Sequence, residues 1–371
     1  MGMCTMVHPH FLFTIYYLLK YKAMKKTILV LLALVGVTAA TAQNSNEWIN
    51  LGFEVRADYQ HELVDGKTVD ANSGFKGKYF NVRLKGKITD QLYYDYRQRL
   101  NKPNKDATFF DATDWLHLTY KPTQNWEISA GKQVVAIGGF EYDKAPIDVY
   151  FASEYWHHIN CYRWGVSGAY ITPKGNDKVL AQIVTSPFDY INGNRKHSFA
   201  YNLMWMGQHD WFTSLYSVNF LEYHPGKFVQ YLSLGNQFNW NNFCLQLDIM
   251  NRATLDDFTF FKNYTIVGDL SYMIKDRVNV FAKASYDVNK SQSGADLCVM
   301  PGTEMTRVGG GVEVYPLKDS HDLRLHVNGG YSFGKNGDPV GALQDNQAFF
   351  DLGVKWKVDV ISALQKVIKK K

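Results

Sequence analysis

The chain has too few cysteines for a disulfide framework or a structural zinc site. It contains four cysteines in 371 residues. Cys161, Cys244 and Cys298 remain once the amino-terminal leader described below is removed, and no two of them have the close spacing of metal-binding motifs. We therefore expect no disulfide scaffold and no cysteine-based metal centre.

The chain also lacks an apolar run long enough for a transmembrane helix. Its most apolar segment, from Thr27 to Val37, is shorter than the roughly 20 residues that a helical span needs. Lys25-Lys26 precedes this segment and Ala40-Thr41-Ala42 follows it, which is the pattern of a cleaved secretory signal. We predict a signal peptide at residues 24–42, and we interpret residues 1–23 as an over-called start.

A strong excess of charge of one sign is missing as well. The formal net charge of +5 falls to +1 when residues 1–42 are removed, because they carry four lysines and no acid, leaving 36 basic and 35 acidic residues. Residues 43–360 hold 32 basic and 35 acidic side chains. Nucleic acid is excluded as an expected partner, since its binding needs a concentrated basic surface.

Linkers and catalytic motifs are missing too. Neither a Pro/Ser-rich linker nor a change of composition divides residues 43–360, and the chain has no Gly-x-Ser-x-Gly elbow. The string Glu154–His158 lacks the spacing of zinc motifs. Gly309–Gly311 lies within an alternating strand, which favours close packing or a kink over a phosphate loop. The prediction is a single domain that is not an enzyme and that has no cofactor or metal.

What the chain does contain is a two-residue hydrophobic period. From Arg277 to Val288, apolar residues alternate with polar ones, with Phe281 the one exception, and Phe80 to Ile88 alternates in the same way. Sixteen such stretches follow one another. Alternation sustained over ten or so residues is typical of tilted membrane strands, with one face toward lipid and the other toward water. The segment Val179 to Val184 is less clear, being almost wholly apolar.

The connections between these stretches alternate between short and long. Short turns are expected at 89–90, 121–125, 172–177, 208–210, 241–242, 275–276 and 315–322, and longer loops at 61–78, 101–114, 135–161, 188–196, 222–228, 253–262, 290–305 and 334–346. A soluble sandwich would also alternate, but it has no reason to keep this asymmetry. The sequence predicts an all-β fold, a 16-stranded antiparallel transmembrane β-barrel with short periplasmic turns and long outer loops.

Aromatic residues are abundant and fall near the predicted strand ends. Phe, Trp and Tyr make 15% of the chain. Such rings pack well at the depth of lipid headgroups, which favours an aromatic girdle over a simple strand preference. The tryptophans expected in the girdle are Trp48, Trp126, Trp164, Trp205, Trp211, Trp240 and Trp356.

Strand parity predicts that a set of basic side chains on the first three strands faces the barrel lumen. Rows of cations can guide anions through a pore, although such residues also pair across strands. The acids on the same strands are Glu54, Asp58 and Asp95. The predicted pore-lining basic residues are Arg56, Arg83, Lys85, Lys87, Arg97 and Arg99.

The third outer loop, residues 135–161, is the longest and is predicted to constrict the pore. Long loops without strands of their own are usually functional. Folded inward, this one would place carboxylates opposite the basic wall and create a transverse field; the alternative is an ordinary external loop. The charged residues expected in the constriction are Glu141, Asp143, Lys144, Asp148 and Glu154.

One segment carries a family resemblance. Residues 131–138 (GKQVVAIG), with Phe151–Glu154 and Arg163–Val166 after them, resemble the corresponding part of the phosphate-selective porin O and P family. The resemblance implies a homotrimer of 16-stranded porins, each with its third loop constricting the channel. Ala136 stands where the family usually has Pro, and Tyr155 where it usually has Arg. Phosphate selectivity in that family depends on clustered Lys and Arg, whereas this loop is net acidic.

The carboxyl end continues past the last strand. Residues 361–371 place apolar side chains at helical spacing beside four lysines, which is compatible with a short periplasmic helix or with a frayed tail.

Together these features predict a porin in the outer membrane of a Gram-negative bacterium, in contact with outer-membrane lipid. It would let small hydrophilic solutes or ions diffuse passively, with anions including phosphate among the candidates. Two alternatives stay open: an outer-membrane β-barrel hydrolase, and a structural or adhesin barrel with a blocked lumen.

Overall fold

The computed structural model describes residues 48–102, 108–189, 197–254, 261–291, 296–361 and 363. The predicted start segment 1–23, the predicted signal 24–42 and residues 364–371 of the carboxyl-terminal tail lie outside this part of the chain. Within the described ranges, no helix has both the length and the apolarity to cross a membrane.

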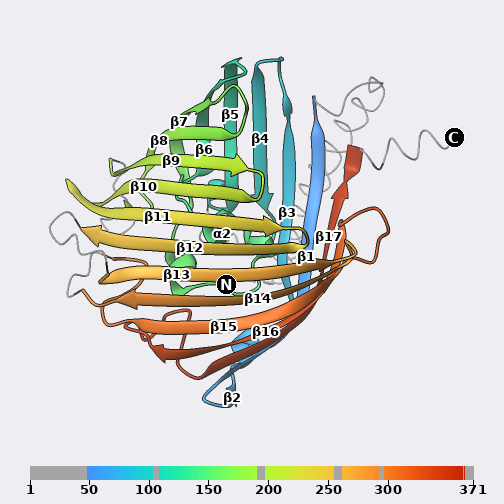
Figure 1. Ribbon diagram of the computed structural model, residues 1–371, viewed down its shortest axis with the longest axis vertical. Coiled ribbons are helices and arrows are strands. Elements are labelled where there is room, and N and C mark those ends of the chain that lie inside the picture. Colours follow the sequence, from blue (N-terminus) through green and yellow to red (C-terminus); the bar gives the residue numbers. More distant parts are fainter. Residues whose placement is uncertain are drawn as a thin grey trace, which may run out of the picture.

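The strands form one closed antiparallel barrel, as predicted. Each of the sixteen barrel strands pairs with its neighbours in the sequence, and the last strand, β17, pairs with the first, β1. Figure 1 shows the strands wrapping around an interior in which a short helix lies. The barrel strands are β1 (Asn50–Val64), β3 (Gly74–Lys87), β4 (Leu92–Arg99), β5 (Thr113–Thr123), β6 (Trp126–Val134), β7 (Tyr162–Ile171), β8 (Asp177–Thr185), β9 (Phe199–His209), β10 (Phe212–His224), β11 (Lys227–Trp240), β12 (Phe243–Thr254), β13 (Asn263–Ile274), β14 (Val278–Asn289), β15 (Glu304–Val314), β16 (Leu323–Lys335) and β17 (Gln347–Asp359).

The remaining elements are short and lie in the connections. A two-residue strand, β2 (Lys67–Thr68), folds back on the end of β1. The helical turns are η1 (Asp70–Asn72), η2 (Phe109–Ala112), α2 (Phe140–Asp143), η3 (Pro146–Asp148) and α3 (Glu154–His158).

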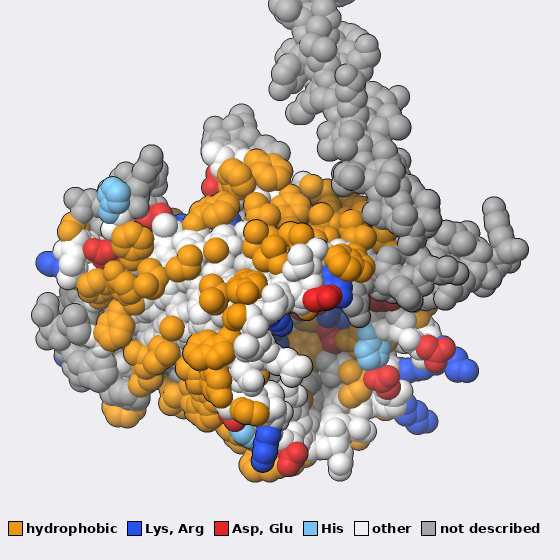
Figure 2. Space-filling model, turned by 90° about the horizontal axis from the view of Figure 1, so that it is seen from above, with side chains coloured by type: hydrophobic (Ala, Val, Ile, Leu, Met, Phe, Trp, Pro, Cys, Tyr) orange, Lys and Arg blue, Asp and Glu red, His pale blue; other side chains and the backbone are white. Residues whose placement is uncertain are grey.

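The side-chain alternation puts apolar residues outside and polar residues inside. On β14, Val280 is 42% exposed on the outer face, whereas Lys283 and Asp287 are buried within the barrel. Figure 2 shows hydrophobic side chains spread over the outer surface, and a hollow edged by charged and other polar side chains. All seven tryptophans expected in the girdle are exposed.

The predicted connections match the structure except at two outer loops. The loop expected at 61–78 is shorter, because β1 runs to Val64 and β3 starts at Gly74. The seven short turns all lie between strand pairs joined at the same end of the barrel. The expected loop at 222–228 is wrong: β10 runs to His224 and β11 starts at Lys227, so only Pro225 and Gly226 separate them. The dipeptide Pro-Gly is a compact turn signal, and the polar residues on either side of it belong to the strands.

Part of the interior is apolar, which explains why the segment 179–184 did not alternate. Val184, Leu221 and Tyr231 of the β8–β11 wall are fully or almost fully buried and pack on residues of the third outer loop. Val184 belongs to β8 and points inward into this cluster. The barrel is therefore filled on one side, not uniformly wet.

The lipid-facing surface leads to a first prediction. Leu270 lies on the outer face of β13, and the adjacent Ser271 faces the lumen. Leu270→Arg should lower the free energy of unfolding by about 2–4 kcal/mol, since a cation near the bilayer midplane loses its hydration. Ser271→Arg should change it by no more than about 0.5 kcal/mol, as for most substitutions at solvated sites. Urea unfolding of the two variants in lipid vesicles measures the difference, and equal losses would show that this face does not contact lipid.

Candidate functional site

The third outer loop, residues 135–161 between β6 and β7, lies inside the barrel. We call it loop 3. Val135, Ile147 and Tyr155 are almost completely buried, although they belong to a connection and not to a strand. Loop 3 contains α2, η3 and α3, and its hydrogen bonds reach strands β8, β10, β12, β14 and β1. The inward folding predicted for this loop is confirmed.

Carboxylates on the barrel wall hold the amino ends of α2 and α3. Asp248 of β12 accepts hydrogen bonds from the backbone N–H groups of Phe140 and Glu141, at 2.8 and 2.7 Å. Asp287 of β14 accepts from the backbone N–H of Glu154 at 2.9 Å. The first N–H groups of a helix have no partner within it, and negative charge is favourable there. The wall thus supplies the N-terminal cap of α2, whose own N-cap residue, Gly139, has no side chain to provide one.

The acid at the start of loop 3 is neutralised by the wall behind it. Glu141 forms an ion pair with Lys283 of β14 at 2.7 Å, and both side chains are more than nine-tenths buried. Lys144 forms a second ion pair, in which the loop supplies the cation and Asp269 of β13 supplies the carboxylate, at 2.6 Å. Asp143, next to them, is exposed.

The middle of loop 3 has a second neutralised acid. Asp148 pairs with Lys355 of β17 at 2.5 Å and with Arg324 of β16 at 3.0 Å. Burial favours the protonated carboxyl, but the two cations outweigh it and lower the pKa of Asp148 below its ordinary value. Asp148 is therefore ionised at neutral pH and bound to the wall.

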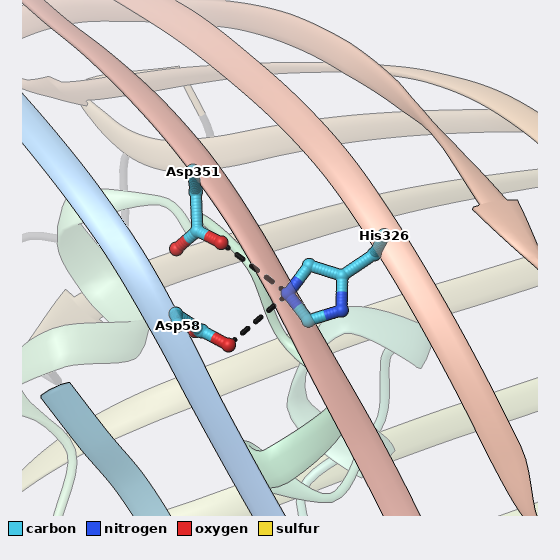
Figure 3. A group of neighbouring side chains, drawn as sticks. All are labelled: Asp58, His326 and Asp351. Atoms are coloured by element: carbon cyan, nitrogen blue, oxygen red, sulfur yellow. Dashed lines mark hydrogen bonds and ion pairs between the residues drawn. The ribbon is translucent and has the colours of Figure 1, made fainter. Parts of the chain in front are cut away.

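The last acid of loop 3 joins it to another outer loop. Glu154 bonds His158 at 2.7 Å and accepts hydrogen bonds from the backbone N–H groups of Ala342 and Leu343 between β16 and β17. Of the five charged residues predicted for the constriction, four therefore bind partners behind or beside the loop. In the string 154–158, Glu154 and His158 bind each other. The cluster of possible metal ligands found among the described residues consists of Asp58, His326 and Asp351 and lies elsewhere (Figure 3).

A stripe of glycines on β15 brings loop 3 against the wall. A Cβ atom on Gly309 would lie 2.7 Å from the ring of Phe151 and 2.5 Å from the carbonyl oxygen of Gly329, closer than such atoms pack. Phe151 in turn contacts Phe349 of β17, with ring centroids 5.4 Å apart. The close packing expected at Gly309–Gly311 is what the structure shows, and it serves the seating of loop 3.

Three of the predicted pore-lining cations are held by wall or loop groups. Arg56 is 2% exposed beneath loop 3 and donates hydrogen bonds to the carbonyl oxygens of Ile147 and Val149. Arg97 and Arg99 of β4 both bind Asp114, at 2.6 and 2.7 Å. Arg99 keeps 21% of its side-chain surface exposed, so of these three it has the most contact with the open lumen.

The other three predicted cations lie where the lumen is open. Arg83 pairs with Asp95 at 2.6 Å but keeps 41% of its side-chain surface exposed. Lys85 is exposed, and Lys87 pairs with Asp90 in the short turn after β3. Lys85 and Asp95 line a cavity of about 520 Å³ at the short-turn end of the barrel. Its other lining residues with a charged or imidazole side chain are His117, Lys121, Glu127 and Lys178.

Sequence reasoning missed the residues that hold loop 3 from the far wall. Strand parity marks them as inward-facing, and that signal was available in the sequence. Their partners lie 107 to 207 residues away along the chain, so no local pattern connects them to the loop. The missed wall residues are Asp248, Lys283, Asp287, Glu313, Arg324 and Lys355.

Comparisons with known proteins support the same architecture. The family described as phosphate-selective porin O and P matches residues 49–213, which confirms the resemblance noted in the sequence. No curated protein matches the chain.

Solved structures with the same fold are outer-membrane proteins. An anion-selective porin from Comamonas acidovorans is 10% identical, with a TM-score of 0.60, covering 84% of this chain and 99% of its own. The outer-membrane protein OmpT of Vibrio cholerae is 14% identical (TM-score 0.56, 84% and 97% covered). OmpF of Salmonella typhi, in complex with daunomycin, is 15% identical (TM-score 0.55, 84% and 97% covered). At these identities the likeness concerns the fold.

The glycine stripe leads to a second prediction. Gly309→Val should displace Phe151 from β15 and move loop 3 into the open lumen, changing single-channel conductance by about twofold or more because little free space exists at the contact. Gly268→Ala is the control, since a Cβ there meets no atom within 4 Å. Bilayer recordings compare the two, and an unchanged conductance in both would show that this contact does not position the loop.

The barrel is apolar outside and polar along its open wall, one loop is folded within it, and the family match covers the strands from β1 into β10. The chain is an outer-membrane porin of a Gram-negative bacterium, and its residues 49–213 match the phosphate-selective porin O and P family.

Proposed function

We propose that small hydrophilic solutes diffuse through this porin along the wall formed by β3–β6, with a preference for anions. The observation that carries this proposal is the position of loop 3. It binds β8, β1 and the β10–β17 wall, leaving the β3–β6 wall facing open space. The permeation path is then lined by the side chains of that open wall.

The charges of the open wall favour anions. Lys121 and Lys178 share one carboxylate, that of Glu127, and Asp95 is matched by Arg83. Lys85 is exposed and has no carboxylate partner among the residues the structure describes. The charged residues that line the cavity of about 520 Å³ are Lys85, Lys121, Lys178, Asp95 and Glu127, with a net charge of +1. Arg83, beside Asp95, adds one more positive charge next to it. In a narrow aqueous space with low-dielectric walls, such an excess raises the local concentration of anions.

We also infer that the chain performs no chemistry and assembles as a homotrimer. Serines that line loop 3 are engaged in structural hydrogen bonds: Ser153 donates to Glu141, and Ser217 accepts from the backbone N–H of Gly138. A hydrolase would need a free nucleophile beside a base. Support for a trimer comes from the family resemblance and from OmpT of Vibrio cholerae, one structure of which is described as a trimer form.

The direct test of the proposal is a planar-bilayer recording of the purified protein. Ohmic conductance steps are expected. In a potassium chloride gradient, the reversal potential should lie closer to the equilibrium potential of chloride than to that of potassium. Silence together with esterase or protease turnover would favour a hydrolase. Silence without turnover would favour a structural barrel. Steps with a cation-selective reversal potential would keep the pore and overturn the anion preference.

Charge reversal on the open wall is a third prediction. The double variant Arg83→Glu/Lys85→Glu should lower the chloride-to-potassium permeability ratio by about three- to tenfold, since one unit charge contributes roughly 1 kcal/mol at 4 Å in water and salt screening and distance reduce this along the path. Lys87→Glu should have a smaller effect, because Lys87 already pairs with Asp90 near the mouth.

Lys227→Glu is the control for that prediction. It changes the net charge by the same amount as a single reversal, at an exposed position beside the short β10–β11 turn. Reversal potentials in a salt gradient are measured for all variants. If Lys227→Glu shifts them as much as the double variant does, the open wall does not set the selectivity.

A further inference from the structure

Lys132 lies on the lipid-facing side of the barrel. It belongs to the outward row of β6, whose members are Trp126, Ile128, Ala130, Lys132 and Val134, and every member except Lys132 is exposed. Its partners in register are Leu116 of β5 and Trp164 of β7, which are 37% and 41% exposed. A cation in such a row is costly at the bilayer midplane and is tolerated near the interface, where its ammonium group can reach polar groups.

The ammonium group of Lys132 reaches an outer loop. Lys132 lies near the end of β6 that leads into loop 3, on the side of the barrel that carries the longer connections. Its Nζ atom donates a hydrogen bond to the carbonyl oxygen of Phe110, in η2, at 2.5 Å. Lys102 of the same β4–β5 loop donates to the carbonyl oxygen of the next residue, Asp111, at 2.6 Å. Two ammonium groups therefore lie at neighbouring carbonyl groups on the outer rim of the barrel.

These two ammonium groups lack a carboxylate partner. In the part of the chain that the structure describes, neither Lys102 nor Lys132 forms an ion pair with an acid. Asp111, the acid next to them, accepts hydrogen bonds from the backbone N–H and the hydroxyl of Thr108, at 2.6 and 2.9 Å. The two lysines and this one acid carry a net positive charge. An excess of this kind attracts an anion from outside the chain.

Exposed aromatic rings lie next to the two ammonium groups. Phe109 and Phe110 of η2 are 60% and 46% exposed. The ring of Phe110 meets the ring of Trp164 edge-on, with centroids 5.4 Å apart. Aromatic rings are favoured at the depth of lipid headgroups. Cations and exposed rings side by side at this depth suit a ligand that has both an anionic group and apolar chains.

An apolar recess of about 590 Å³ lies below this place on the outer surface. It is lined mainly by apolar side chains of strands β6 to β10 and by the backbone at Gly168 of β7. A Cβ atom at Gly168 would meet no atom within 4 Å. The β6–β7 pair joins the recess to the lysines (Figure 1): Lys132 is opposite Trp164 and Ile128 is opposite Gly168. Four residues along a strand correspond to roughly 13 Å.

We propose that the outer surface of β5–β7 with η2 is a binding site for a phosphate-bearing lipid of the outer leaflet. Lys102 and Lys132 would neutralise its phosphate, and an acyl chain would occupy the recess beside Gly168. Lysine binds phosphate as a point charge. Lys102 is exposed and contacts the phosphate directly, whereas Lys132, 7% exposed, acts mainly through its charge. The site is outside the lumen and is independent of the proposed permeation path.

A second copy of the chain fits this surface less well than a lipid does. An interface between copies would have to bring an acid to Lys102 and Lys132. On the outward rows of the described strands, the acids at the long-loop end are Glu222 and Glu304. Glu222 accepts hydrogen bonds from two backbone N–H groups, and Glu304 accepts one from a tyrosine hydroxyl. Both acids are thus engaged within their own chain, whereas a lipid phosphate brings a free negative charge.

The first experiment measures lipid binding and the role of the lysines. Native mass spectrometry counts the molecules of diphosphoryl lipid A bound to the detergent-purified protein as the lipid concentration is raised. One lipid A per chain is expected. Lys102→Gln/Lys132→Met should weaken its binding by about tenfold or more, since the charge-assisted contacts to the phosphate are lost.

Lys335→Gln is the matched control for the lysines. Lys335 is exposed on the outward row of β16, at the same end of the barrel, and this variant should bind lipid A as the wild type does. Heat-modified migration on gels checks that each variant has folded. Should the double variant fail to fold, Lys102→Gln alone changes an exposed side chain and should weaken binding by about threefold, the effect of one exposed charge contact.

The second experiment tests the recess. Gly168→Leu should fill it and weaken the binding of lipid A by about fivefold, because the acyl chain loses apolar contact. Gly268→Leu is the matched control, since a Cβ at Gly268, on the outer face of β13, also meets no atom within 4 Å. Inorganic phosphate in large excess is then added to the wild type, and lipid A should stay bound, because the free ion does not replace the contacts of the acyl chain.

Other results would overturn the proposal. Equal losses in the lysine variants and in Lys335→Gln would show that net charge alone attracts the lipid. Displacement of lipid A by inorganic phosphate, with no effect of Gly168→Leu, would assign the lysines to a free anion. A lower proportion of oligomer on unheated gels in Gly168→Leu, with unchanged lipid binding, would assign the surface to a second copy. The bilayer recording that tests the proposed function has no bearing on these results.

Discussion

The closure of β17 on β1 is the constraint on which the rest of the structure depends. A backbone amide in hydrocarbon has no water to bind, so an open sheet edge cannot stay in a membrane. Thirteen residues of β1, from Gly52 to Val64, pair with β17, and the two ends of the chain become neighbours in one wall. Closure also creates the two environments that every side chain then meets, lipid outside and an enclosed lumen inside. Because β1, β17 and β16 are adjacent, Arg56 of β1 can lie near His326 of β16. Arg56 also reaches loop 3.

The enclosed lumen imposes its own requirement on loop 3. A connection of 27 residues drawn into the barrel brings with it backbone N–H groups and carboxylates that leave bulk water, and an unpaired buried charge costs several kcal/mol. The wall supplies partners for these groups. Asp248 and Asp287 cap α2 and α3, and Lys283 and Lys355 bind Glu141 and Asp148. Such pairs add little net stability relative to apolar packing, but they allow one position of the loop, since any other leaves buried charges unmatched.

The sequence predicted what is local and periodic. Strand parity, the short turns and the limits of loop 3 follow from a two-residue period and from turn residues, and they agree with the structure. The loop expected at 222–228 was wrong because polar residues at the ends of β10 and β11 were taken for a connection. The neutralisation of Glu141 and Asp148 could not be predicted, since their cations stand 142 and 207 positions further along the chain and nothing in either local pattern specifies the pairing. The family resemblance gave the fold of the loop and not its partners.

These pairings change what loop 3 can contribute to selectivity. An acidic loop with free carboxylates would repel anions from the lumen, and the composition of residues 135–161 suggests such a loop. With Glu141 and Asp148 bound to the wall behind them, little of that negative charge acts on the open side, because each acid has a cation at 3 Å or less. In the proposed permeation path, loop 3 would determine the width, and the sign of charge would be left to Arg83, Lys85 and their neighbours on β3–β6. A single porin fold can in this way change its preferred ion by substitutions on the open wall without disturbing the contacts that seat the loop.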